Sequence, residues 1–329
     1  MNGELVSIVM ATYNGEKYLR QQLDSILEQT HQHFELIVVD DASTDKTLSI
    51  LKEYAALDDR IHVFPAEINL GLVSNFERGL RLAGGDFIAL SDQDDIFRKD
   101  KIELLLAALK NHPERDLVLS DLSLIDENGN NIAHSMWSYS KLNPKQGKPF
   151  GHLLYANFAT GCAMMFTRRL LELAIPFPPD CTVHDWWLAV IATSSRAGGI
   201  CLVDKQLTAY RQHESNVLGT KKAEKLEMGT IISRITASPR GHANFESRMR
   251  LYKLDLDRLT GYLQSSVWSS IDRTAIEKSR EVFVNYANDA HSSLIGRISK
   301  LPKRLRHAWI IGGVASCLPV VMHTISPYK

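Results

Sequence analysis

Hydrophobic and polar positions alternate between two patterns over the first 120 residues. Continuous apolar runs, such as residues 6–11 and 34–39, are typical of strands buried on both faces. Between the runs, apolar residues recur at helical spacing, as Leu19, Leu23 and Ile26 do. The pattern predicts strands over residues 6–11, 34–39, 61–64, 86–90 and 117–120, and helices over 15–29, 43–56, 72–82 and 99–109.

Strands that alternate with helices pair in parallel through right-handed crossovers, which predicts a doubly wound α/β sheet. In such a sheet, ligands bind beyond the carboxyl ends of the strands. Polar side chains follow three of the predicted strands, at residues 12–14, 40–41 and 91–95. We therefore expect these three groups to meet on one rim of the sheet.

The pattern becomes less regular after residue 120. An Asn-Gly pair predicts a turn, and a polar stretch with proline and glycine is typical of a mobile loop. Beyond residue 222 the chain predicts long helices and no further strand. In order, these predictions are the turn at 126–130, the loop at 138–150, a strand at 163–167, a helix at 186–195, a strand at 201–210, and helices at 249–264 and 275–294.

The composition is that of an ordinary soluble globular protein, with 44% hydrophobic and 23% charged residues in a chain of 329. Lys+Arg and Asp+Glu both number 38, so no overall basic field favours nucleic acid. The four cysteines are far apart and form no CxxC pair, which predicts reduced thiols in a cytosol. The N-terminus lacks a basic stretch, so we predict no signal peptide.

Three carboxylates crowd the turn after the fourth predicted strand, at Asp92, Asp94 and Asp95. Hard cations such as Mg²⁺ and Mn²⁺ prefer oxygen ligands and usually share them with substrate phosphates. The alternative is a solvated turn before a helix, where Asp is also favoured. No glycine-rich phosphate loop follows any early strand, so neither a Rossmann cofactor nor a P-loop fits. Phosphate binding here would therefore depend on a metal.

A second acidic pair, Asp40 and Asp41, ends the second predicted strand. A carboxylate at this place can accept a hydrogen bond from a pyrimidine imide N–H or a ribose hydroxyl. Either residue could instead cap the helix that starts near Ser43. We assign the capping role to Asp40 and the ligand contact to Asp41.

With these motifs in place, the sequence resembles glycosyltransferase family 2. The resemblance covers about residues 5–217 and is carried by four ordered segments: VSIVMATYN at 6–14, ELIVVDDASTD at 35–45, NLG at 69–71 and DQDD at 92–95. It implies a GT-A fold, with a mainly parallel sheet flanked by helices, a nucleotide-sugar donor and a divalent metal, Mg²⁺ or Mn²⁺. Residues 1–220 would form this domain, with a donor part at 1–120 and an acceptor part at 121–220, before a helical region at 221–329.

Carried over residue by residue, the resemblance places Tyr13 and Asp41 at the nucleobase, with Thr12 close by. Asp92 would reach the ribose, and Asp94 would hold the metal between the diphosphate oxygens. The form of the acidic turn is similar to that of bacterial rhamnosyltransferases, which implies dTDP-L-rhamnose as the donor. The remaining donor-binding predictions are Asn14, Asn69, Asn75, Ser91 and Gln93.

The resemblance places the catalytic base at Asp185, although the preceding His184 departs from the usual Glu. This carboxylate would take the proton of the acceptor hydroxyl as its oxygen attacks the anomeric carbon, which inverts the configuration. The alternative reading of Asp185 is a helix N-cap with core tryptophans behind it. Trp186 and Trp187 are the predicted acceptor contacts, because indoles can stack on a sugar face, although one of them would be plain core.

The resemblance also implies a second metal ligand, His213, in the tail after the last predicted strand, although a lone exposed loop histidine is the commoner case. Residues 216–222 would form a lid over bound donor. The Gln-x-x-Arg-Trp signature of processive synthases is absent, which favours the addition of a single sugar. Five basic residues within 297–306, followed by an apolar run at 308–322, favour docking on an anionic inner leaflet. A packed C-terminal helix or a homodimer contact is the alternative.

The sequence thus predicts a cytoplasmic, inverting, metal-dependent glycosyltransferase whose C-terminal segment could dock it peripherally at the inner membrane. Its acceptor would be a hydroxyl of a lipid-linked cell-surface glycan precursor, of the O-antigen, lipopolysaccharide core or capsule type. The alternatives are a UDP-hexose-dependent transferase, a nucleotidyltransferase and a non-catalytic nucleotide- or glycan-binding module. A nucleotidyltransferase would carry a glycine-rich phosphate loop after the first strand, and residues 12–15 do not form such a loop sequence.

Overall fold

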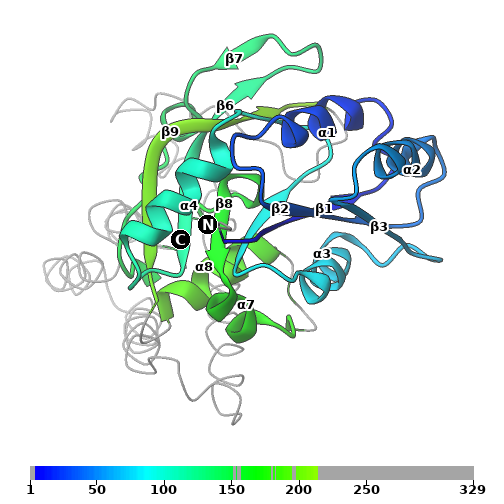
Figure 1. Ribbon diagram of the computed structural model, residues 1–329. Coiled ribbons are helices and arrows are strands. Elements are labelled where there is room, and N and C mark those ends of the chain that lie inside the picture. The colour runs from blue at the N-terminus through cyan, green and yellow to red at the C-terminus, as the bar shows by residue number, and fades with distance from the viewer. Residues whose placement is uncertain are drawn as a thin grey trace, which may run out of the picture. The chain divides into compact units, whose positions relative to one another are not determined.

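The computed structural model describes residues 4–150, 153, 157–178, 181, 183–194 and 198–213. Most of these belong to one compact unit, formed by residues Met1–Gly147, Phe158–Ala192 and Ala197–Lys222. A second unit takes residues Lys148–Asn157, Thr193–Arg196 and Ala223–Lys329, nearly all outside the described part. The fold of the first unit is built on a central sheet (Figure 1).

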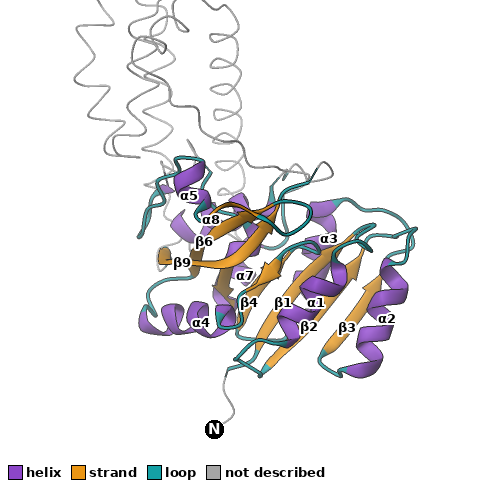
Figure 2. Cartoon of the chain, turned by 90° about the horizontal axis from the view of Figure 1, so that it is seen from above, coloured by secondary structure: helices purple, strands orange, loops and turns teal. Residues whose placement is uncertain are grey.

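The sheet has the strand order β3-β2-β1-β4-β8-β6-β9-β5, with β7 paired to β6. Figure 2 shows β3, β2, β1 and β4 side by side. The strands are β1 Val6–Thr12, β2 Phe34–Asp40, β3 Ile61–Pro65, β4 Phe87–Ser91, β5 Ile96–Phe97, β6 Leu117–Ile125, β7 Asn131–Ala133, β8 Met164–Thr167 and β9 Ile200–Arg211. The helices are α1 Leu19–Leu27, α2 Thr47–Leu57, α3 Leu72–Leu82, α4 Lys101–Asn111, α5 Met136–Tyr139, η1 Gly161–Ala163, α7 Arg168–Ala174 and α8 His184–Ser194.

The predicted parallel arrangement is confirmed for β1 to β4, since β1 pairs in parallel with β2 and β4, and β2 with β3. Helices α1 and α2 lie on one side of β1–β3 and α3 lies on the other (Figure 1). Alternate β1 residues therefore face different helices. On the α3 side the backbone approach is close, because a Cβ on Gly79 would lie 2.6 Å from Val9 Cγ1.

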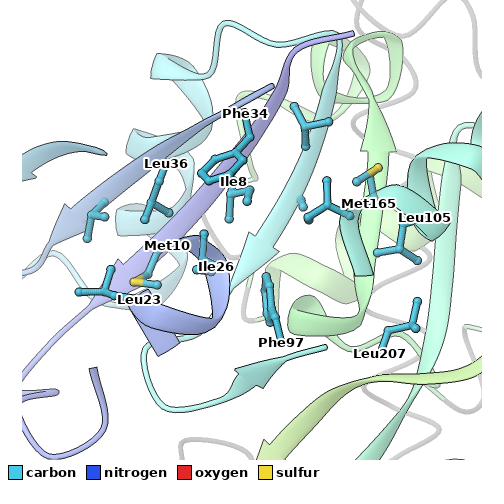
Figure 3. Packing of buried hydrophobic residues seen from close by; sticks show 14 of the residues in the cluster. Ile8, Met10, Leu23, Ile26, Phe34, Leu36, Phe97, Leu105, Met165 and Leu207 are labelled. Atoms are coloured by element: carbon cyan, nitrogen blue, oxygen red, sulfur yellow. The ribbon is translucent and has the colours of Figure 1, made fainter. Parts of the chain in front are cut away.

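The main hydrophobic core lies between the sheet and the helices α1 and α4. Ile8 and Met10 of β1 pack there with Leu23 and Ile26 of α1, and all four side chains are fully buried (Figure 3). The same cluster continues through Phe97 of β5 to the helix α4 and the strand β9. The acidic turn at residues 92–95 is followed directly by β5, and the Phe97 side chain of this strand packs in the core.

The second half of the sheet is mixed, which corrects the expectation of a mainly parallel sheet. Strand β8 runs antiparallel to both β4 and β6, while β6 pairs in parallel with β9. The strand β6 extends to Ile125 rather than ending at Ser120, because β9 continues alongside it. Its pairing with β9 shifts register near Asp121. The short elements β5, β7, α5 and α7 were not expected from the sequence pattern.

Two expectations about helix starts were wrong. The first helix begins at Leu19 rather than at residue 15, and α2 begins at Thr47 rather than at Ser43. Ser43 does not cap α2, because its hydroxyl donates to Asp40 Oδ1 and accepts the Asn14 N–H. The predicted turn at 126–130 is confirmed as the β6–β7 connection, in which Asp126 accepts three hydrogen bonds from Asn128 and Asn130.

Several predictions fall outside the described residues and stay predictions. They are the lid at 216–222, the helices at 249–264 and 275–294, the C-terminal basic and apolar segment, and the domain boundary near residue 220. The predicted loop at 138–150 lies within the described residues. It starts in α5, and Gly147 within it forms a bridge with Ile200. None of the described helices combines the length and the apolar character that crossing a membrane requires.

Candidate functional site

The loops after β1 and β2 are tied together by their own polar side chains. Thr12 Oγ1 donates to Asp40 Oδ1 over 2.9 Å, and Asp40 Oδ2 accepts the Ser43 N–H. Asn14, whose φ is 48°, accepts the Thr44 N–H on its Oδ1 over 2.8 Å. The prediction that Asp40 caps the helix α2 is therefore wrong, because its carboxylate instead joins Thr12 to Ser43 and holds the two loops together.

Gln93 joins the acidic turn to the loop after β1. Its Oε1 accepts the Tyr13 N–H over 2.8 Å and its Nε2 donates to the Tyr13 carbonyl over 3.1 Å. This amide pairs with the backbone as a neighbouring strand would, and it keeps the two loops adjacent. The Tyr13 ring is left 49% exposed, so it is available for stacking on a planar ligand.

Asp41 organises the loop before α3. Its Oδ1 accepts the Leu70 N–H over 2.7 Å, and its Oδ2 accepts the Gly71 N–H over 2.9 Å. Asn69 closes the same loop, since its Nδ2 donates to the Asp41 carbonyl. The NLG segment therefore serves to receive the Asp41 carboxylate. Each oxygen keeps a further lone pair, so the contacts of Asp41 and Asn69 with a donor stay predictions.

Two predicted donor contacts are enclosed by the fold. Asn75 donates to the Val39 carbonyl and accepts from Arg78, and only 1% of its surface is exposed. Ser91 is fully buried, and its hydroxyl accepts from Gln22 Nε2. These contacts give both residues a structural role, and their contact with a donor stays a prediction that no bond in the structure supports.

The acidic turn brings Asp92 and Asp95 together with Cys162 of η1. One ligand atom from each of the three side chains lies within 4.8 Å of the others. Burial and the neighbouring Asp95 and Asp94 charges raise the pKa of Asp92 well above its ordinary value. Burial, followed by the charge of Asp94, raises the pKa of Asp95 to about 7. The turn thus gathers carboxyl groups whose ionisation burial opposes.

Asp94 and His213, the two predicted metal ligands, lie together although they are 119 residues apart in the sequence. His213 Nε2 and Asp94 Oδ2 are 2.8 Å apart and both side chains are largely buried, at 12% and 13% exposure. The His213 ring also stacks in a tilted arrangement on Tyr18, with 5.2 Å between centroids. A carboxylate and an imidazole so close together offer the oxygen and nitrogen ligands that a divalent cation takes, and the neighbouring Asp92 and Asp95 carboxyl groups favour a cation here.

Arg211 holds the acidic turn in place, a role that its local sequence does not indicate. Its backbone N–H donates to Asp95 Oδ1 over 3.1 Å, and its Nε donates to the Asp94 carbonyl over 2.8 Å. Nη2 donates to Gln21 Oε1, and the guanidinium lies 4.5 Å from the centre of the Tyr18 ring. This side chain is 1% exposed. It links β9, α1 and the acidic turn in one network.

We expect Arg211→Met to destabilise the protein by on the order of 3 kcal/mol, because the carbonyls of Asp94, Asp126 and Glu127 and the side chain of Gln21 lose one buried donor at once. Thermal unfolding should then show a fall in Tm of roughly 6–12 °C. The matched control is Arg20→Met, whose partner Glu53 is half-exposed, as Arg20 itself is. An exposed pair contributes less than about 1 kcal/mol, so equal shifts for both variants would contradict the role of Arg211.

A buried lysine lies beside the same turn. Lys101, the first residue of α4, is fully buried, and its Nζ donates to the Cys162 carbonyl over 2.5 Å. The ammonium also lies 3.1 Å from the centre of the Phe97 ring. Burial lowers its pKa to about 7, while the charges of Asp95 and Asp92 act in the opposite direction. Lys101 is thus a built-in countercharge to the acidic turn.

The predicted base, Asp185, lies in the first turn of α8. Its Oδ2 accepts the Gly161 N–H over 3.0 Å, and its Oδ1 accepts the Trp186 N–H. Asp185 is the second residue of α8 rather than its N-cap, because the helix begins at His184, and its role as the base stays a prediction. Asp185 also contributes to the raised pKa of Asp92, so the two carboxyl groups belong to one electrostatic cluster.

The neighbours of Asp185 differ in exposure. His184 stacks on Phe76 with 4.1 Å between centroids, and burial lowers its pKa to about 3, so it is neutral. Trp187 is 3% exposed and donates to the Ala174 carbonyl, which makes it the core tryptophan of the pair. Trp186 is the partly exposed one. Acceptor contacts by either tryptophan stay predictions.

The structure thus brings the predicted acids of β4 and α8 together, with the loops after β1 and β2 joined to the same rim. Sequence reasoning missed Cys162, Lys101 and the network of Arg211, which approach from later segments. Of these, Lys101 carried a signal, since it stands four residues before Leu105, on the apolar stripe of the helix predicted at 99–109. Nothing in the local sequence marks Cys162.

Comparison with known proteins places these residues in a family. A family model described as "Glycosyl transferase family 2" matches residues 7–173. A putative teichuronic acid biosynthesis glycosyltransferase, TuaG of Bacillus subtilis, is 42% identical over 218 residues, covering 62% of this chain and 79% of that protein. An uncharacterized glycosyltransferase of Methanocaldococcus jannaschii is 40% identical over 232 residues, covering 69% of this chain and 77% of its own.

Solved structures share the fold. The structure of S. aureus TarS residues 1–349 in complex with UDP-GlcNAc has a TM-score of 0.56 and 20% sequence identity, and it covers 93% of this chain and 80% of that chain. A likeness at this identity concerns the fold alone. Together with the helix-flanked sheet described above, it confirms the GT-A architecture, here with a sheet whose second half is mixed.

Proposed function

Because this chain belongs to glycosyltransferase family 2, we propose that it moves one sugar from a nucleotide-sugar donor to an acceptor hydroxyl with inversion of configuration. The observation that supports this best is the gathering of Asp92, Asp94, Asp95 and Asp185 in one electrostatic cluster. These acids come from the end of β4 and the start of α8, at the rim where a sheet of this kind binds ligands.

In the proposed reaction, the acceptor oxygen attacks the anomeric carbon as the bond from that carbon to the donor phosphate breaks. The Asp185 carboxylate takes the hydroxyl proton, so the products are the glycoside and the nucleoside diphosphate. Gly161 and Trp186 supply the N–H groups that orient this carboxylate. Tyr13 and Asp41 would contact the nucleobase, and Asp92 the ribose.

A divalent cation fits the remaining residues. Asp94 and His213 would hold it, with Mg²⁺ or Mn²⁺ as the proposed ion, because both side chains end at the acid-rich turn. When bound, such an ion neutralises charge on the departing diphosphate. Arg211 and Lys101 then act from behind the turn, where they hold its backbone and balance its charge.

Two donors are supported by different observations. The acidic turn's likeness to rhamnosyltransferases favours dTDP-L-rhamnose, which is our first proposal. The structure of TarS with UDP-GlcNAc favours a UDP-hexose as the second candidate. TuaG is named for teichuronic acid biosynthesis, and this supports a bacterial cell-surface polysaccharide precursor as the acceptor. Peripheral membrane contact through the C-terminal segment and a homodimer remain parts of the proposal.

A binding panel tests the donor. We expect calorimetry with nucleoside diphosphates and nucleotide sugars to show binding that requires Mg²⁺ or Mn²⁺, tightest for dTDP-rhamnose. Tighter binding of UDP-hexoses would replace the first candidate with the second. If no nucleotide sugar bound with either metal, the proposed function itself would be wrong. Tyr13→Ala should weaken the binding of each nucleotide in this panel by roughly tenfold, because the nucleobase loses one stacking contact.

A further inference from the structure

A potential ligand of a different kind, the thiol of Cys162 in η1, lies beside the acidic turn. Its sulfur, one oxygen of Asp92 and one oxygen of Asp95 lie within 4.8 Å of one another. Cys162 is 1% exposed, and its carbonyl accepts hydrogen bonds from Lys101 Nζ and Thr208 Oγ1. The backbone that carries the thiol is therefore fixed beside the two carboxyl groups.

We propose that Asp92, Asp95 and Cys162 form a binding site for a thiophilic divalent cation of the zinc and cobalt(II) class. Carboxylates alone suit hard cations such as Mg²⁺ and Mn²⁺, whereas a thiolate ligand selects zinc-like ions. The proposal stands apart from the sugar transfer, since it concerns which cation these three side chains take. It also predicts that zinc competes with the hard cation proposed at Asp94, because the two sites share one turn.

A second observation points to a cation at this place. Asp95 is fully buried and its Oδ1 accepts the Arg211 N–H, whereas its Oδ2 has no nitrogen or oxygen donor among the described residues, and the weak donor beside this carboxyl group is the Cys162 thiol. A buried acceptor without a partner costs about 1–3 kcal/mol. A bound cation would satisfy this oxygen. The Asp95 carboxyl group is one of the three that converge at the thiol.

The separations suit a small ion. Zinc binds sulfur at about 2.3 Å and carboxylate oxygen at about 2.0–2.2 Å, so a tetrahedral ion holds such atoms roughly 3.6 Å apart. The sulfur and the two carboxylate oxygens lie up to 4.8 Å apart, and side-chain shifts of about 1 Å would bring them to that separation. Asp92 is only half-buried, which leaves an approach from solvent. The thiol proton passes to solvent as the metal–sulfur bond forms, so the thiol adds one proton to those that the carboxyl groups release on binding.

Cobalt(II) binding to the full chain tests the site, because a cobalt–thiolate bond gives a charge-transfer absorption in the near ultraviolet. We expect this band in the parent protein and in the control Cys201→Ser, which removes another buried thiol on β9. In Cys162→Ser the band should disappear, and cobalt affinity should fall by about 10-fold or more. Calorimetry in buffers of different ionisation heat should show one proton fewer released.

A parent protein without the band would overturn the proposal, and so would a band that persists in Cys162→Ser or vanishes in Cys201→Ser. If Cys162→Ser does not fold, as judged by circular dichroism, Cys162→Ala takes its place. X-ray absorption of the zinc-loaded parent protein gives a readout that needs no variant. One sulfur among the zinc ligands is expected, and a shell of only nitrogen and oxygen would contradict the site.

Discussion

Asp185→Asn should abolish sugar transfer while leaving nucleotide binding nearly intact. The amide keeps the size of the side chain but cannot take the proton of the acceptor hydroxyl, so kcat should fall by roughly 10²–10⁴-fold. Metal-dependent binding of the nucleoside diphosphate should change by less than about threefold, because the predicted donor contacts lie on β1, β2 and the acidic turn. Initial-rate kinetics and calorimetry on the same preparation measure the two effects.

The matched control for this prediction is Glu172→Gln on α7, which changes an exposed carboxylate of the same unit. It should leave kcat and nucleotide affinity unchanged. Undiminished transfer by Asp185→Asn would remove Asp185 from the mechanism. Equal loss of transfer and of nucleotide binding would instead indicate that the variant disturbs the rim, since Asp185 accepts the Gly161 N–H.

Ionisation of Asp95 should lower the stability of the metal-free protein as the pH rises from about 4 to about 7, against the opposite contribution of His184, whose lowered pKa favours the folded state as the pH rises to about 6.5. Burial and the charge of Asp94 raise the pKa of Asp95 to about 7, above the ordinary value of 3.8. Between these values the folded state keeps the Asp95 proton that the unfolded chain has lost. The contribution of Asp95 to stability therefore decreases as the pH rises and levels off above about 7. About three pKa units correspond to roughly 4 kcal/mol.

Asp95→Asn should remove this part of the pH dependence. With a chelator present, we expect the Tm of the variant minus that of the parent protein to increase between about pH 4.5 and pH 7.5. A saturating divalent cation should raise the Tm of the parent protein at pH 7.5 more than that of the variant, because only the parent protein has the buried Asp95 charge that a cation would offset. Asp126→Asn, in the exposed β6–β7 turn, is the control. Parallel Tm profiles for Asp95→Asn and the parent protein would show that Asp95 ionises without penalty.

Much of the first half of the fold was predictable, because its signals are local. A strand buried on both faces reads as an unbroken apolar run, and the helices between such runs show one apolar stripe. These patterns located β1 to β4 and therefore the polar groups at their ends. They did not predict that the Asp41 carboxylate accepts the N–H groups of residues 70 and 71 within the protein.

The second half was harder to predict for a physical reason. Strand β8 pairs antiparallel with β4 and β6, which precede it by up to 80 residues, and short elements such as β5 depend on β9 for their partner. Helix starts were misplaced where side chains made other bonds. Ser43, for example, bonds Asp40 and Asn14 instead of capping α2.

The sequence by itself determined that acids would stand at the ends of buried parallel strands, since apolar runs and the polar residues that follow them are properties of neighbouring positions. Only the tertiary structure decided what surrounds those acids. Arg211, Lys101 and Cys162 reach the acidic turn through pairings between distant segments, and burial then changes their charges. A local pattern cannot encode such distances, because they are set by which strands meet in the folded sheet.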